Sequence, residues 1–401
     1  MAGYETAIAW GIFGLTYFTL ALGYVPFFRL DRTGAVFIGA LAATGLGLLT
    51  LEESFLALEY RTLLLLFNMM IIVSYFVNSG VFSRILGFLE RIENQKRMLW
   101  ATVLVSGLAS AVFINDVVCL VLTPVVADIV LARKWNPLPY LLAVAMASNI
   151  GSAMTPIGNP QNMYIASVSG VSWSEFVWRI FPLSALGLVL LGFALLPMLK
   201  GGEGGNAPPE HHHHARGRDL ARAGAVLAAV LAGFWAGYEA ALVTGLGAAF
   251  LLLTRHIPRK RIFSLVDWDL LVLFASLFVV MAAADKYGVT ARAYGLLEPL
   301  GIGTSAGFPA ILAALSNFVG NVPAVVFLAP LVERMGGGHE SFLLMAAVST
   351  FAGNLTLVGS IANLIVAEKA KAKGITVDFW SYTKAGFGVT LVLCIAAALV
   401  L

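Results

Sequence analysis

The sequence predicts an all-α polytopic membrane protein made of two inverted repeats, each with five transmembrane helices and one re-entrant hairpin. Three observations support this fold class. The 401-residue chain is 59% hydrophobic and 12% charged, whereas an average soluble domain has roughly 25% charged residues. Apolar runs of about 20 residues, the length that a spanning helix needs, recur from end to end. Finally, the two halves of the chain carry matching motifs.

Ten apolar segments are predicted to be full membrane spans. The first of them is long enough to cross a bilayer and lacks the small-residue pattern of a cleaved signal, so we expect nothing to be removed there. The ten predicted spans cover residues 6–25, 33–51, 62–80, 138–168, 180–199, 219–236, 239–254, 267–285, 341–368 and 385–401.

Two further apolar segments, 98–131 and 306–333, do not fit as ordinary spans. Each has a polar interruption in its middle, "FINDVV" in the first and "SNFVGNVPA" in the second. Each is long enough for two half-helices and short for two full crossings. We therefore predict two re-entrant hairpins that enter and leave the membrane on the same side.

The distribution of basic residues predicts the orientation. With these spans, 20 of the 25 Lys and Arg residues fall on one side of the membrane, Arg29 and Arg32 among them. The positive-inside rule makes that side cytoplasmic. We expect a multi-pass protein of the cytoplasmic membrane with both termini outside.

A polar segment divides the chain near its middle. Residues 201–218 are rich in Gly and Pro, which predicts a cytoplasmic linker between a first repeat, 1–200, and a second repeat, 219–401. The linker contains His211–His214, which either bind a metal or form a solvated tract. Five spans precede the linker and five follow it. An odd number of spans per half inverts one half relative to the other.

The halves also resemble each other in sequence. "INDVVCLVLTPVV" at 114–126 matches "GNVPAVVFLAPLV" at 320–332, and "SNIGSAMTPIGNPQN" at 148–162 matches "GNLTLVGSIAN" at 353–363. The first copy of the latter motif has four additional residues. Weak internal similarity of this kind is typical of secondary transporters with inverted repeats.

These motifs interrupt helices within the membrane, in the two hairpins and in the broken helices 138–168 and 341–368. Broken helices persist in lipid only against protein or a water-filled cavity. Half-helix N-termini suit an anion or an oxyacid, and exposed carbonyls with Asn or hydroxyl oxygens suit Na⁺. The predicted substrate- or ion-binding residues are Asn115, Asp116, Ser148, Asn149, Ser152, Thr155, Gly158, Asn159, Asn162, Asn317, Asn321, Asn354, Thr356, Gly359, Ser360 and Asn363.

Asp116 is the acid that the sequence places at an interruption. An intramembrane carboxylate is a functional candidate, and Asp116 is the predicted coupling residue for a cation or a proton. The alternative is that it caps the helix "VVCLVLTP". Cys119, one turn beyond Asn115, is either a ligand for trivalent arsenic or a small core residue. Asp267, Asp269 and Glu239 lie near span ends and are expected to snorkel to the membrane surface or to face water.

The sequence carries no sign of an enzyme. It has no Gly-rich, Lys-containing phosphate loop, and the linker is too short for a nucleotide-binding domain. Transport is therefore driven by an ion gradient or is passive, and the sequence leaves open a separate soluble ATPase partner. We expect a small inorganic solute, a coupling ion (Na⁺ or H⁺) and the lipid bilayer as partners. We expect no nucleic acid, no metal site and no other cofactor.

The motifs "FINDVVCLVLTP" and "SNIGSAMTPIGNPQN" resemble those of the ion transporter superfamily, which includes citrate and divalent anion–sodium symporters. They are most similar to the branch of arsenical pump membrane proteins and plant silicon efflux transporters. The resemblance implies a scaffold region, a transport region with both hairpins, a homodimer and an elevator-like movement. The Ser-Asn-Thr motifs of the dicarboxylate carriers match only in part, because Ile150 follows Ser148-Asn149 and Phe318 follows Ser316-Asn317.

The leading hypothesis is a secondary active transporter that exports arsenite, antimonite, silicic acid or another inorganic anion by proton- or sodium-coupled antiport. The sequence shows no basic residue at any interruption, which favours a neutral or weakly charged substrate. The alternatives are a Na⁺/H⁺ antiporter, a Na⁺-coupled importer of citrate or a dicarboxylate, and a membrane subunit without transport activity.

Overall fold

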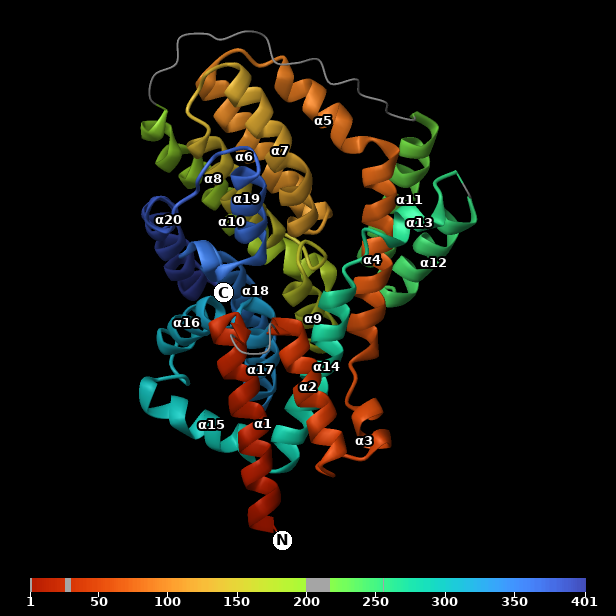
Figure 1. Cartoon of the computed structure of the whole chain (residues 1–401), viewed down its shortest axis with the longest axis vertical. Helices are drawn as coiled ribbons and strands as arrows, with labels where there is room; N and C mark the ends of the chain where they lie inside the picture. The colour runs from red at the N-terminus through yellow and green to blue at the C-terminus, as the bar shows by residue number, and fades with distance from the viewer. Residues whose placement is uncertain (1, 26–29, 200–216, 255) are drawn as a thin grey trace.

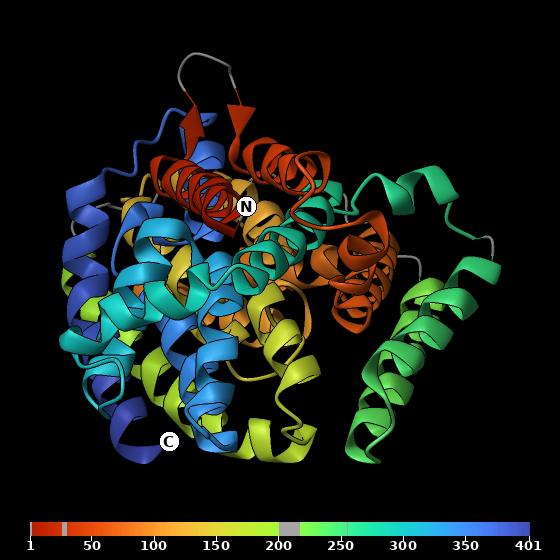
Figure 2. The same ribbon diagram turned by 90° about the horizontal axis from the view of Figure 1, so that it is seen from below.

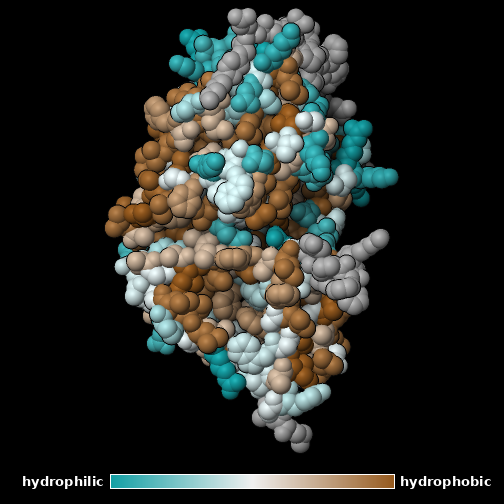
Figure 3. Space-filling view, turned by 60° about the vertical axis from the view of Figure 1, so that its left-hand side comes forward, coloured by the Kyte–Doolittle hydropathy of each residue, from teal (hydrophilic) through white to brown (hydrophobic). Residues whose placement is uncertain are grey.

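The computed structural model describes residues 2–25, 30–199, 217–254 and 256–401, and almost all of its regular structure is helical (Figure 1). In the described ranges, six helical segments are long and apolar enough to cross a membrane, and they start at Gly3, Tyr60, Asn115, Trp173, Trp268 and Phe379. Large apolar side chains such as Leu15, Leu246 and Trp380 are 66–69% exposed. Hydrophobic residues cover much of the face seen in Figure 3, as expected for a surface in contact with lipid.

The first half begins with two antiparallel helices joined by a small sheet. Strands β1 and β2 pair antiparallel, with Tyr24 opposite Asp31, so the structure departs from the all-α prediction at this turn. The Asp31 carboxylate accepts a hydrogen bond from the Gly34 backbone N–H at 2.8 Å and caps the next helix. The elements of this part are α1 (Ala2–Leu22), β1 (Tyr24–Val25), β2 (Leu30–Asp31), α2 (Arg32–Gly45), α3 (Leu51–Leu56), α4 (Tyr60–Ser79) and α5 (Val81–Glu90).

The remainder of the first half contains the first hairpin and the first broken helix. Helices α6 and α7 pack against each other and against α8. The bounds are α6 (Gln95–Val112), α7 (Asn115–Ala132), α8 (Leu138–Ser152), α9 (Pro160–Val168), α10 (Trp173–Leu195) and the 3-10 helix η1 (Leu196–Met198).

The second half repeats this order of elements. Helices α16 and α17 pack against each other and against α18, as α6 and α7 do with α8. Figure 2 shows that α11 and α12 stand together at one side of the molecule. The bounds are α11 (Gly217–Trp235), α12 (Ala240–Leu253), α13 (Arg259–Phe263), α14 (Trp268–Lys286), α15 (Val289–Leu297), η2 (Glu298–Leu300), α16 (Gly307–Val319), α17 (Asn321–Arg334), α18 (His339–Ala352), η3 (Leu357–Gly359), α19 (Ile361–Lys371) and α20 (Phe379–Val400).

The ten predicted spans do not all form long helices. The predicted span 33–51 is the 14-residue α2 followed by a turn, and the predicted span 239–254 is the 14-residue α12. Conversely, α7 has 18 residues and is long and apolar enough to cross, although the prediction made it half of a re-entrant hairpin. Apolar run length is a poor guide here because turns and helix ends are as apolar as the helices themselves.

Two short amphipathic helices, α5 and α15, were not predicted from the sequence. Each follows a glycine in the left-handed conformation, Gly80 (φ 87°) after α4 and Gly288 (φ 69°) after α14. Such a glycine commonly ends a helix because it has no Cβ to oppose the left-handed turn. In Figure 1, α5 lies near the top of the molecule and α15 near the bottom.

Candidate functional site

Four helix interruptions meet at the centre of the molecule. They are the steps from α6 to α7 (113–114), α8 to α9 (153–159), α16 to α17 (residue 320) and α18 to α19 (353–360). The two halves contact each other at this point, because α9 packs against α17 and α19 packs against α7. The second helix of each broken pair therefore touches the hairpin of the other half.

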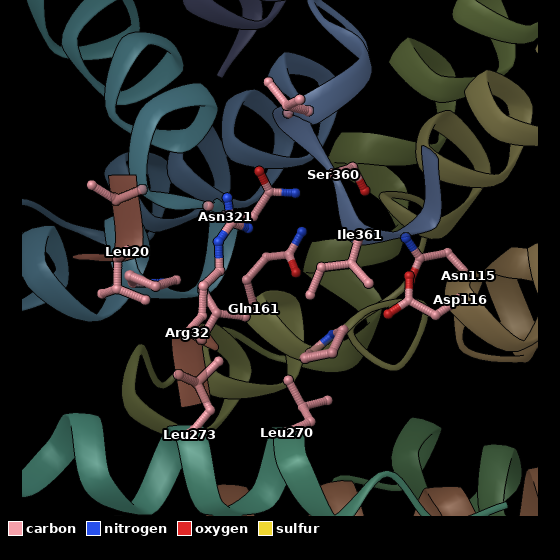
Figure 4. Close-up of a pocket in the computed structure, with 17 residues that line it drawn as sticks. Leu20, Arg32, Asn115, Asp116, Gln161, Leu270, Leu273, Asn321, Ser360 and Ile361 are labelled. Atoms are coloured by element: carbon pink, nitrogen blue, oxygen red, sulfur yellow. The ribbon is translucent and has the colours of Figure 1, made fainter. Parts of the chain in front are cut away.

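The N-termini of α7, α9, α17 and α19 line one pocket of about 60 Å³ (Figure 4). Free N–H groups and aligned peptide dipoles give each helix N-terminus a partial positive charge, so four of them together favour a negatively charged or oxygen-rich ligand. Apolar side chains of α1 and α14 close the pocket. The lining residues used below are Arg32, Asn115, Asp116, Gln161, Asn321, Gly359 and Ser360, with Leu20, Leu270 and Leu273 as the apolar wall.

Asn149 joins the two halves through hydrogen bonds among side chains. The Asn115 amide donates to the Asn149 oxygen at 3.0 Å, and the Ser360 hydroxyl donates to the same oxygen at 3.2 Å. The Asn149 amide donates to the oxygens of Asn354 at 2.8 Å and Asn363 at 2.9 Å. Both polar atoms of Asn149 are therefore occupied, and this buried residue holds the interruptions together rather than facing a solute.

Asn162 and Asn363, which are equivalent in the two motifs, both bind backbone carbonyls through their side-chain amides. Each side-chain amide donates to two backbone carbonyls of the interruption that precedes its helix. Without these amides, buried carbonyls at both interruptions would lose a partner, which is costly in an apolar interior. The accepting carbonyls are those of Ser152 (3.4 Å), Thr155 (3.3 Å), Gly353 (2.7 Å) and Thr356 (3.3 Å).

Asn159 caps α9 and also reaches across to the second half. Its oxygen accepts from the Asn162 backbone N–H at 2.9 Å, and its amide donates to the hydroxyls of Ser152 at 3.0 Å and Thr350 at 3.2 Å. Thr350 also accepts from the Gln161 amide at 3.3 Å. The first interruption is therefore tied to α18 by polar contacts.

The second interruption is held by Asn317 and Asn354. The Asn317 amide donates to the Ala352 carbonyl at 2.8 Å, and the Thr356 hydroxyl donates to the Asn317 oxygen at 3.0 Å. The Asn354 amide donates to the Met146 carbonyl at 3.0 Å. Unlike Asn149, whose partners are all side chains, Asn317 and Asn354 satisfy buried backbone carbonyls.

Two of the predicted glycines are sites of close approach. A Cβ on Gly158 would lie 2.2 Å from the Ser152 carbonyl oxygen, and a Cβ on Gly359 would lie 2.5 Å from the Asn317 side-chain oxygen. The Gly158 carbonyl accepts from the Asn115 backbone N–H at 3.1 Å. The turn at Gly158 therefore anchors the first hairpin.

Of the sixteen predicted residues, five line the pocket and eleven lie outside its lining. The five in the pocket are Asn115, Asp116, Asn321, Gly359 and Ser360. The eleven others are Ser148, Asn149, Ser152, Thr155, Gly158, Asn159, Asn162, Asn317, Asn354, Thr356 and Asn363. All sixteen were predicted as binding residues because a polar residue at a helix interruption has the same sequence pattern whether it binds a ligand or satisfies a backbone group.

Asp116 lies half-buried in the first turn of α7. The helix begins at Asn115 with Ile114 as its N-cap and has no side-chain cap, so the predicted alternative of a capping role for Asp116 is wrong. Asp116 makes no hydrogen bond or salt bridge with another described residue. A carboxylate without a partner on the wall of a pocket is suited to bind a cation or a proton.

Cys119 is fully buried on α7 and does not line the pocket. Across the described ranges, no cluster of three or more His, Cys, Asp and Glu residues is arranged to hold a metal ion. His211–His214 and nearly all of the predicted linker lie outside the described residues.

The structure corrects the expectation that no basic residue faces the interruptions. Arg32, which the charge count placed at the end of a span, begins α2 and lines the pocket beside Asn321 (Figure 4). No local pattern in the sequence marks this placement, because a basic residue after an apolar run is ordinary at a membrane surface. The prediction of a neutral or weakly charged solute rested on the absence of a basic residue at the interruptions, and Arg32 removes that reason.

Comparisons with known proteins agree with this architecture. A family model described as citrate transporter (CitMHS) matches residues 17–341. An uncharacterized transporter of Mycobacterium tuberculosis is 32% identical, with 97% of each chain covered. The silicon efflux transporter of Oryza sativa subsp. japonica is 27% identical, with 95% of this chain and 94% of that protein covered.

Among solved structures, the YdaH transporter of Alcanivorax borkumensis has a similar fold. It superposes with a TM-score of 0.58 at 15% identity, over 99% of this chain and 96% of that one. At this identity the similarity concerns the fold alone.

Proposed function

Because the chain belongs to the citrate transporter family, we propose that it is a secondary active transporter that exports a metalloid oxyacid or a small inorganic anion. That it is an integral membrane transporter follows from the family and from its apolar helices. One observation carries the proposal on the solute: four helix N-termini converge on one small pocket at the crossing of the two halves.

The size of the pocket supports a small solute. Its volume of about 60 Å³ accommodates roughly four to six water molecules at ~10–15 Å³ each. Arsenite and silicic acid have three or four oxygens around one central atom and match this size. The silicon efflux relative and the arsenical-pump-like motifs support the same class of solute.

Asp116 is the proposed coupling residue, with Na⁺ or H⁺ as the coupling ion. Its carboxylate lines the pocket without a salt bridge to another described residue. Binding a cation or a proton at Asp116 would alter the charge of the site that the solute occupies. This change links the two species in one antiport cycle.

The proposed architecture is that of inverted repeats, 1–200 and 219–401, with α6–α7 and α16–α17 as re-entrant hairpins. The repeated element order and the positions of α5 and α15 at opposite ends of the molecule support it. We propose further that the protein lies in the cytoplasmic membrane with both termini outside, works as a homodimer and moves by an elevator-like alternation. Cysteine labelling at both termini of intact cells tests the orientation.

A second candidate is Na⁺-coupled import of citrate or another carboxylate. The family description and Arg32 in the pocket favour it. A citrate ion has 13 non-hydrogen atoms and needs a wider pocket than the one seen, so this function requires the hairpins to open.

Flux measurements on proteoliposomes test both candidates. We expect arsenite or silicic acid efflux that responds to a pH or Na⁺ gradient, and Asp116→Asn to lose that response. Asp269→Asn, an exposed acid in the first turn of α14, is the matched control. Flux that ignores both gradients contradicts the coupling, and Na⁺-driven citrate uptake without oxyacid flux favours the second candidate.

A further inference from the structure

We propose that Arg32 binds the anionic oxygen of the solute and that the pocket selects an oxyanion that keeps at least one hydroxyl group. The inference rests on the proposed function and narrows its class of solute. It concerns a residue that lies outside both hairpins and both broken helices.

Arg32 and Asp116 occupy opposite sides of the pocket. In Figure 4 the Arg32 side chain rises beside Asn321, while Asn115 and Asp116 lie at the far side, with Gln161 and Ile361 between them. The pocket therefore has a positive end and a negative end. An anion held at the Arg32 end leaves Asp116 free for the coupling ion.

The Arg32 guanidinium is half-buried and has no hydrogen bond or salt bridge to another described residue. A guanidinium has five N–H donors in a planar fork that matches the oxygens of an oxyanion. By contrast, Arg179 pairs with Glu340 at 3.4 Å and Arg222 pairs with Asp219 at 3.3 Å. A half-buried cation without such a partner is costly, which favours a site completed by a ligand.

Two glycines lie close to the guanidinium. A Cβ on Gly23 would lie 3.7 Å from Arg32 Nε, and a Cβ on Gly320 would lie 4.0 Å from Arg32 Nη1. Both glycines have positive φ, 85° and 96°. Gly320 immediately precedes α17, so the guanidinium faces a helix N-terminus. Two positive features in this arrangement repel each other unless an anion lies between them.

Two fully buried side-chain oxygens in the pocket have no hydrogen-bond donor among the described residues. They are the Oδ1 atoms of Asn115 and Asn321, which hold equivalent positions at the starts of α7 and α17. Asn115 is only 5% exposed. A buried acceptor without a donor is expensive, and a hydroxyl group of the solute supplies the missing donor. The pocket thus offers donors for an anionic oxygen and acceptors for a hydroxyl.

Three probes of similar size separate these requirements. Hydrogen phosphate has negative charge and a hydroxyl group, sulfate has charge without a hydroxyl at neutral pH, and silicic acid has hydroxyls without charge. Isothermal titration of the purified full-length protein should show hydrogen phosphate binding more tightly than sulfate and silicic acid. Equal or tighter binding of silicic acid would overturn the proposal.

Arg32→Gln should weaken hydrogen phosphate binding on the order of 10- to 100-fold, the usual effect of losing hydrogen bonds to a charged group. It should leave silicic acid binding within about twofold, since neutral hydroxyls need no guanidinium. Arg179→Gln is the matched control and should change neither. Unchanged phosphate binding in Arg32→Gln would refute the role of Arg32.

Arg32→Lys provides a second variant if Arg32→Gln fails to fold. It keeps the charge but loses the planar fork, so phosphate binding should weaken by roughly threefold to tenfold. Citrate is tested in the same assay. If citrate binds more tightly than phosphate and Arg32→Gln weakens its binding, the anion that Arg32 binds is a carboxylate.

Arg32-dependent phosphate binding without coupled oxyacid flux would refute the proposed function alone. Coupled flux without anion binding would refute this inference alone.

Discussion

The tips of the two hairpins start from the same residue type and end in different environments. Asn115, at the first tip, donates through its backbone to Gly158 and through its side chain to Asn149, and it is buried. Asn321, at the second tip, is half-buried and makes no side-chain hydrogen bond to another described residue. The first tip is anchored by the hydrogen bonds of Asn115 itself, whereas the second hairpin is tied to its interruption through Asn317 and not through Asn321.

The difference follows from the length of the two interruptions. Asn149 and Asn162 are 13 positions apart, while their counterparts Asn354 and Asn363 are 9 apart. The longer segment provides the turn whose Gly158 carbonyl reaches the first tip. The charges differ as well, because Asp116 belongs to the first tip and Arg32 lies beside the second. Equivalent sequences have thus produced one rigid, acidic tip and one less constrained tip beside a cation.

The largest expected effect comes from moving the acid between the tips. Val322 is the counterpart of Asp116 and is 8% exposed. We expect Asp116→Val to abolish gradient-driven flux, and Val322→Asp in the same chain not to restore it, because a carboxylate there would pair with Arg32. Flux in proteoliposomes measures both variants. Recovery of flux in the double variant would show that the two tips are interchangeable.

A methyl group at each interruption should have the next largest effect. Gly158→Ala places a Cβ 2.2 Å from a backbone oxygen, so the anchoring turn must move, and we expect a loss of about 3 kcal/mol in stability. A Cβ at Gly359 would lie 3.0 Å from its nearest backbone oxygen, that of Gly353, so Gly359→Ala should cost less, about 1–2 kcal/mol. Thermal unfolding in detergent measures both losses. A greater loss for Gly359→Ala would contradict the assignment of the rigid tip.

Truncating the asparagines themselves should have the smallest effect. Asn115→Ala removes a hydrogen bond and leaves the buried Asn149 oxygen with one fewer donor, at a cost of about 1–2 kcal/mol. Asn321→Ala removes no hydrogen bond to a described residue and should change stability by less than about 0.5 kcal/mol. The same unfolding assay compares them, and equal losses would mean that both tips are equally fixed.

Much of the architecture could be predicted from local sequence. The hairpin segments 98–131 and 306–333 lie within a few residues of α6–α7 and α16–α17, because Asn, Gly and Pro in an apolar run interrupt a helix wherever it packs. The binding roles within the interruptions could not be predicted in the same way. Asn149 and Asn321 are the same residue type, and both lie at helix interruptions. Only the partners available in three dimensions separate an amide that holds the fold from one that faces the pocket.

The sequence by itself determined a helical membrane transporter with interruptions in two matching halves, because hydropathy and helix-breaking residues act locally. The tertiary structure decided which polar groups share a pocket. Arg32 follows a small sheet near the N-terminus and is 289 positions from Asn321 in the chain, yet the two line the same cavity. The charge of a binding site depends on contacts between distant segments, and hydropathy along the chain carries no record of them.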